Sequence, residues 1–78
     1  MGRVTHYYSK IGVAVIELKA SLAKGDRILI KGSTTDLEQT VESMQIEHKD
    51  IEKAEAGQAI GLKVKDRVRE GDAVYKIS

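Results

Sequence analysis

Cysteine, proline, phenylalanine and tryptophan are all absent from this sequence of 78 residues. Without cysteine, the chain has no disulfide, no thiolate metal ligand and no cysteine nucleophile. Small secreted domains usually depend on disulfides, so their absence favours a reducing, cytoplasmic location. Without Phe or Trp, the core must consist of smaller aliphatic side chains. The length predicts one domain over residues 1–78, too small for a large enzyme cleft.

Long apolar runs are missing as well. The longest, residues 13–16, is far shorter than the roughly 20 residues of a membrane-spanning helix. Residues 1–9 turn polar too early for a secretory signal peptide. We therefore expect no membrane partner.

The residues that are present favour β-structure. Valine and isoleucine number fifteen against five leucines, and branched side chains suit strands better than helices. Alternating or apolar segments at residues 11–18, 27–31, 37–47, 60–64 and 73–77 predict strands. Glycine-containing turns at 23–26 and 70–72 separate some of them. Together these features predict an all-β protein, a small closed six-stranded antiparallel β-barrel.

Residues 37–47 carry a break in their alternation. Val41 shares its parity with Leu37, whereas Met44 and Ile46 have the opposite parity. A β-bulge at Glu42 and the serine after it would turn both sets inward. We therefore expect Val41, Met44 and Ile46 all to be buried.

One short helical turn is predicted at residues 50–56. Asp50 is a favourable N-cap, Ile51 and Ala54 would share a face, and Gly57 would end the helix. A helix of one or two turns would serve as a connector.

Features of an enzyme are weak. The two histidines, His6 and His48, form no metal-binding spacing. The glycines at 57 and 61 are not followed by the Lys-Ser or Lys-Thr of a phosphate-binding loop. We expect no catalytic residue, no metal, no cofactor and no bound nucleotide.

Charge is unevenly distributed. Residues 36–55 have a net charge of −5, and the remainder of the chain has +6. Alternate positions near the end are basic, and in an extended strand such neighbours lie ~6.6 Å apart, close to the spacing of phosphates in nucleic acid. Tyr7 or Tyr8 would add a surface for base stacking. Alternation alone also creates such rows, so the pattern favours the solvated face of a half-buried strand over a binding site. The candidate phosphate contacts are Lys63, Lys65, Arg67 and Arg69.

Four segments, taken in order, resemble the second domain of translational GTPases. They are residues 12–16 with 22–26, residues 41–48, residues 54–64 and residues 70–74. The resemblance covers residues 2–77 and implies a closed six-stranded β-barrel that docks on a GTPase domain, on ribosomal RNA or on transfer RNA. Gln45 stands where the elongation factors have a glutamate beside the terminal adenosine of transfer RNA. The C-terminal barrel of collagenase-like peptidases is similar too.

Two functions remain open on this basis. The first is a translation elongation factor-like, RNA- or ribosome-associated module in protein biosynthesis, with ribosomal or transfer RNA as partner. The second is a protein–protein interaction barrel, a separate accessory domain of a peptidase or GTPase.

Overall fold

The computed structural model describes residues 2–77, and within them it contains ten β-strands and no helix. The all-β prediction is therefore confirmed. The strands are β1 (Gly2–Tyr8), β2 (Val13–Leu18), β3 (Leu22–Ala23), β4 (Arg27–Lys31), β5 (Asp36–Thr40), β6 (Met44–Ile46), β7 (Lys49–Ile51), β8 (Lys53–Ala54), β9 (Ala59–Lys63) and β10 (Ala73–Lys76).

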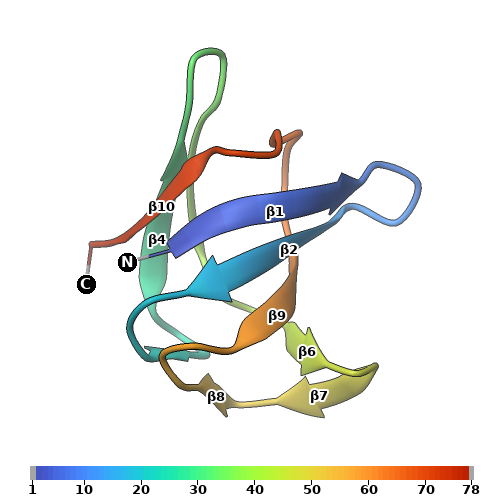
Figure 1. The fold of residues 1–78 in the computed structure, drawn as a ribbon, viewed down its shortest axis with the longest axis vertical. Helices are drawn as coiled ribbons and strands as arrows, with labels where there is room; N and C mark the ends of the chain where they lie inside the picture. Colours follow the sequence, from blue (N-terminus) through green and yellow to red (C-terminus); the bar gives the residue numbers. More distant parts are fainter. Residues whose placement is uncertain (1, 78) are drawn as a thin grey trace.

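Eight strands form one antiparallel sheet in the order β5-β4-β10-β1-β2-β9-β6-β7, while β3 and β8 pair separately. The sheet curls around its buried side chains into a half-barrel (Figure 1). The predicted closed six-stranded barrel is wrong, because the sheet keeps two edge strands, β5 and β7, that each pair with one neighbour.

The core is aliphatic and lies inside the curl. In β2, Ala14, Ile16 and Leu18 are fully buried, whereas the alternating residues Val13, Val15 and Glu17 are half-buried on the outer face. This alternation follows from the opposite orientation of successive side chains in a strand. The other buried apolar residues are Val4, Leu22, Ile28, Ile30, Val41, Met44, Ala54, Ile60, Leu62, Val64, Val68 and Val74.

The break in alternation at residues 41–43 is an interruption of the strand. β5 ends at Thr40 and pairs with β4, and β6 begins at Met44 and pairs with β9 and β7. The chain thus changes partners, and Val41 and Met44 are buried as predicted, with Ile46 packed partly against the core. No bulge is present at Glu42, where one was predicted. A register shift is found instead in β1, between Val4 and His6.

The predicted helix at residues 50–56 is also wrong. Residues 49–51 pair with β6, and residues 53–54 pair with β3. The Asp50 carboxylate accepts a hydrogen bond from Gln45 Nε2 at 3.0 Å and caps no helix. Sheet pairing with distant segments replaces the local hydrogen bonds that a one- or two-turn helix would make, and such short helices are marginal by themselves.

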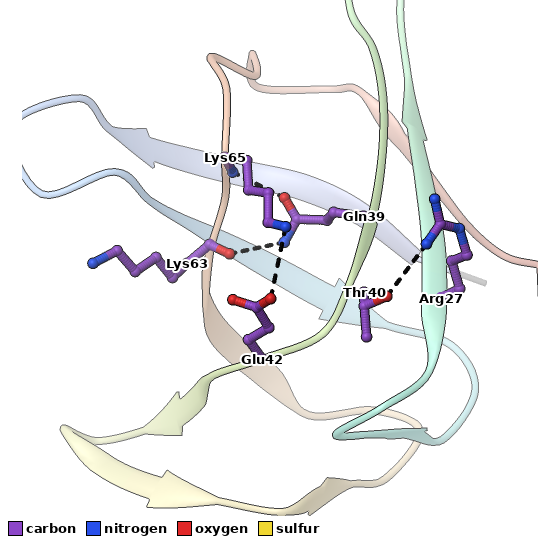
Figure 2. Close-up of polar contacts among 6 residues, drawn as sticks. All are labelled: Arg27, Gln39, Thr40, Glu42, Lys63 and Lys65. Atoms are coloured by element: carbon purple, nitrogen blue, oxygen red, sulfur yellow. Dashed lines mark hydrogen bonds and ion pairs between the residues drawn. The ribbon is translucent and has the colours of Figure 1, made fainter.

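Gln39 connects the edge strand β5 to the chain that leaves β9. Its side chain is 3% exposed. Its Nε2 donates to the carbonyl of Lys63, and its Oε1 accepts from the backbone N–H of Lys65, both at 2.9 Å (Figure 2). The amide therefore replaces a pair of backbone ladder bonds across the opening of the half-barrel.

Asp26, the residue before β4, joins three further segments. Its Oδ2 accepts from the N–H of Ala23 at 2.9 Å and lies 3.2 Å from Nζ of Lys76. Its backbone carbonyl accepts from the N–H of Val41. The hydrogen bond from Ala23, with a smaller contribution from Lys76, lowers the pKa of this carboxyl below its ordinary value of 3.8.

Replacing Gln39 by Glu should destabilise the protein in a pH-dependent way. At neutral pH the carboxylate would face the Lys63 carbonyl, leaving a buried acceptor unpaired and a buried charge, for a loss of about 2–4 kcal/mol in the free energy of unfolding. A protonated carboxyl can donate to Lys63 and accept from Lys65, as the amide does. Because burial raises the pKa of such a group, the loss should be smallest below about pH 4 and grow as pH rises. Urea denaturation at several pH values measures it.

Gln58→Glu is the matched control for this substitution. Gln58 is exposed and uses Oε1 only as an acceptor, from the N–H of Glu55 at 2.7 Å. A carboxylate can accept in the same way, so its effect should stay within about 0.5 kcal/mol. Equal losses in both variants, or no dependence on pH for Gln39→Glu, would show that the bridge does not hold the sheet.

Asp26→Asn should lower stability at neutral pH but not in acid. Because the folded state lowers the pKa of Asp26, the stabilising contribution is complete above about pH 4–5 and is lost as pH falls through the folded pKa. We expect the variant to be about 0.5–1 kcal/mol less stable at pH 7, with the difference shrinking as pH falls through the folded pKa. Urea denaturation measures this, with the exposed Glu52→Gln as control. A difference that persists unchanged at pH 2 contradicts the assignment.

Candidate binding surface

A largely apolar groove, here called the outer groove, lies on the convex face of the sheet. It encloses about 440 Å³. Its floor comes from the outward-facing residues of β2 and β9, and its walls come from the β1–β2 and β6–β7 hairpins, which project from the same side of the molecule (Figure 1). The lining residues are Tyr8, Ile11, Val13, Val15, Gln45, Glu47, His48, Ala59, Ile60 and Gly61.

The strand register explains why this face is hollow. Val15 in β2 pairs with Gly61 in β9, and Gly61 pairs with Gln45 in β6. The glycine therefore leaves a gap between two outward-facing side chains. A β-carbon at Gly61 would lie 3.4 Å from Cγ1 of Val13, an ordinary contact. The gap is thus open to occupation by other atoms.

Tyr8 and Ile11 extend the apolar surface beyond the floor. Both are large hydrophobic residues that remain well exposed, at 51% and 63%. The turn that carries them is held by the N–H groups of Ile11 and Gly12, which both donate to the carbonyl of Tyr8, and Gly12 has a positive φ of 65°. Contiguous exposed apolar surface of this kind is typical of a binding face.

The opposite wall is a strained hairpin turn. Glu47 and His48 have positive φ angles of 52° and 65°, which a two-residue turn of this kind requires but which Asn and Gly adopt more readily. Left-handed conformations in other residues cost of the order of 1 kcal/mol each. The β6–β7 pairing holds this turn, and it places both side chains at the rim of the groove.

The predicted basic row is divided between two environments. Only Lys63 belongs to a strand, because β9 ends there and residues 64–72 are irregular. The ammonium of Lys65 lies 3.6 Å from Glu42 Oε1 (Figure 2). Arg67 and Arg69 line a separate polar pocket beside the loop that precedes β5. All four are exposed, but the expected row along the penultimate strand is wrong because the Gln39 bridge and the burial of Val68 redirect the chain.

Gln45 and Tyr7, the other two predicted site residues, do not lie together. Gln45 is exposed and lines the outer groove. Tyr7 is half-buried and packs partly against the core, so it offers less stacking surface than expected. Tyr8 is the tyrosine at the groove. The valines of β2 and Gly61, which form the floor, were not predicted as site residues, although the apolar character of both β2 faces was a signal for them.

Within the part of the chain that the structure describes, no group of three or more His, Asp or Glu side chains is arranged to hold a metal ion. The same residues include no helix long and apolar enough to cross a membrane. His6 lies near Tyr8, with ring centroids 6.3 Å apart, and its Nδ1 is 3.7 Å from Glu70.

The known proteins whose sequences are similar to this chain are named protease and collagenase. No family model matches it. An uncharacterized protease of Methanocaldococcus jannaschii is 53% identical over 76 residues, 96% of this chain and 19% of the relative. A collagenase of Porphyromonas gingivalis is 40% identical over 78 residues, 97% of this chain and 22% of the relative. The chain thus spans about a fifth of the length of these relatives.

The fold agrees with that relationship. The C-terminal domain of a protein described as a U32 peptidase, from Geobacillus thermoleovorans, superposes with a TM-score of 0.91 and 21% identity, covering 99% of this chain and 90% of that one. At this identity the superposition shows a shared fold, and the relatives of higher identity are named protease and collagenase. The resemblance to translational GTPases, and with it the role in protein biosynthesis, is therefore wrong.

Contact of the basic residues with RNA stays a prediction. If these side chains contact phosphates, the logarithm of the RNA affinity should fall as the logarithm of the salt concentration rises. The slope should be about 0.7–0.9 for each phosphate contact. Replacing Lys65 and Arg67 by Ala should then flatten the slope by about 1.4–1.8. The measurement is titration of labelled ribosomal and transfer RNA at several salt concentrations. An unchanged slope, or no binding at low salt, would leave these side chains as a solvated surface.

Proposed function

We propose that this chain is a non-catalytic accessory domain of a U32-type peptidase and that its outer groove docks on the peptidase portion. The observation that carries the proposal is the apolar groove of about 440 Å³ on the convex face of the sheet. It fits a domain that works against a partner surface, since monomeric domains seldom leave such a face uncovered.

The relatives supply the partner. In each, a segment of this size is joined to about four times as much additional chain, in proteins named protease or collagenase. The matched segment is therefore tethered to the remaining parts of those proteins. These relatives therefore suggest a peptidase portion as the partner of this chain.

A non-catalytic role fits the residues of the groove. His48 and Glu47 stand at its rim, but both are exposed and neither is paired with another polar side chain within residues 2–77. A nucleophile and base within hydrogen-bond reach of each other are the usual mark of a hydrolytic site. Binding, with hydrolysis supplied by the partner, is the simpler role for such a face.

The test uses the M. jannaschii protease with its matched segment deleted as partner. Calorimetric titration with this chain should show one-to-one binding, and the chain alone should hydrolyse neither gelatin nor casein. Ile11→Lys places a charge in the groove and should weaken binding at least tenfold, about 1.4 kcal/mol. Gly61→Val, which fills the gap in the floor, should weaken it as well.

Ile77→Lys is the matched control. Ile77 is an exposed isoleucine, at 45%, that does not line the outer groove. The Ile77→Lys variant should bind the peptidase portion as tightly as the unmodified chain does. Equal binding by Ile11→Lys and Ile77→Lys would exclude the groove as the docking face, and hydrolysis by the chain alone would exclude a non-catalytic role.

A further inference from the structure

We propose that a second site, here called the arginine pocket, binds a carboxylate group of a peptide. The pocket encloses about 360 Å³ and is separate from the outer groove. Its lining residues are Thr34, Thr35, Asp36, Leu37, Asp66, Arg67 and Arg69.

The two arginines reach the pocket because of the residue between them. Val68 is buried in the core at 1% exposure. Its side chain points inward, whereas Arg67 and Arg69 on either side of it are both exposed. Both line the pocket, and within residues 2–77 neither guanidinium has an ion-pair or hydrogen-bond partner.

Backbone hydrogen bonds hold this segment in place. The N–H of Arg67 donates to Asp66 Oδ1 at 2.7 Å, and the N–H of Arg69 donates to Asp72 Oδ2 at 2.8 Å. Asp72 is itself buried. The two side chains are thus carried on an ordered wall, although their ends are free.

The facing wall is fixed through the same aspartate. Gly32 packs so closely on Asp72 that a β-carbon there would overlap the Asp72 carboxylate. The N–H of Gly32 donates to the carbonyl of Thr35 at 2.8 Å, which closes the turn. Asp72 therefore sets the position of the Gly32–Thr35 turn relative to the arginines.

Thr35 is the second sign of a ligand. The residue is 5% exposed, yet its hydroxyl has no hydrogen-bond partner among the described residues. No fully buried side-chain nitrogen or oxygen among them lacks a partner, so this hydroxyl opens into the pocket that Thr35 lines. The hydroxyl is therefore accessible from the pocket, where it can donate a hydrogen bond to an oxygen of a ligand.

The charges select the type of anion. Two arginines and a hydroxyl suit an oxyanion, because guanidinium groups bind carboxylates and phosphates through paired hydrogen bonds. Asp36 and Asp66 line the same pocket, and their charges oppose a doubly charged phosphate more than a singly charged carboxylate. Asp36 remains able to accept from a peptide N–H. A carboxylate carried by a peptide therefore fits best.

The test is a titration of the isotope-labelled 78-residue chain, followed by nuclear magnetic resonance. The probe is N-acetyl-glycyl-glycine with a free C-terminal carboxylate, and the comparison probe is its C-terminal amide. The carboxylate should shift the signals of Thr35 and the side chains of Arg67 and Arg69, and the amide should bind at least tenfold more weakly. Inorganic phosphate should also bind more weakly.

Variants identify the contacts. Arg67→Gln and Arg69→Gln should each weaken carboxylate binding about tenfold, and Thr35→Val, which keeps the shape, about threefold. Arg3→Gln, an exposed arginine outside this pocket, should change nothing. No shift at high probe concentration, equal binding of the amide, tighter binding of phosphate or equal loss in Arg3→Gln would each overturn the proposal. The pocket shares no lining residue with the outer groove, so this result is independent of the docking test.

Discussion

The Gln39 amide is the interaction on which the shape of this half-barrel depends. The sheet curls but does not close by backbone pairing, so the chain leaving β9 needs another partner beside β5. A buried amide supplies both a donor and an acceptor there. Because it holds residues 63–65, it also determines where the irregular segment 64–72 begins. Lys65 and the two arginines take their positions from that point.

Each of the two surfaces follows from a constraint elsewhere in the fold. The outer groove exists because strand pairing brings Gly61 between the outward-facing Val15 and Gln45. The arginine pocket exists because Val68 is buried while its neighbours are not, and because Asp72 ties two loops together. The first surface is apolar and suits a protein partner; the second is polar and suits an anionic group. The two surfaces share no lining residue, so each can be tested without altering the other.

Short motifs and identity over the whole chain point to different families. Short turn and strand motifs made the chain resemble translational GTPases, but identities of 40–53% over almost its whole length connect it with proteins named protease and collagenase. Gly and Asp are common in tight turns of many unrelated proteins. Short motifs of this kind report the type of fold, whereas the function resides in the surface that a fold carries.

The sequence by itself determined the elements whose signal is local. The excess of Val and Ile predicted an all-β chain, and alternating or apolar segments predicted the strands at residues 27–31 and 60–64. The change of parity predicted the burial of Val41 and Met44. Glycine placed the turns at Gly25 and Gly71, both with positive φ. The tertiary structure decided those features that depend on contacts with residues far along the chain. Asp50 lies in a strand and not at a helix start because β6 pairs with it across a turn of Glu and His that carries no hairpin signature. The basic row is broken because Gln39, 24 residues before Lys63, binds the backbone at that point. A one-dimensional pattern records the period of a strand but not the strand or side chain that will lie beside it, and here those neighbours set the site.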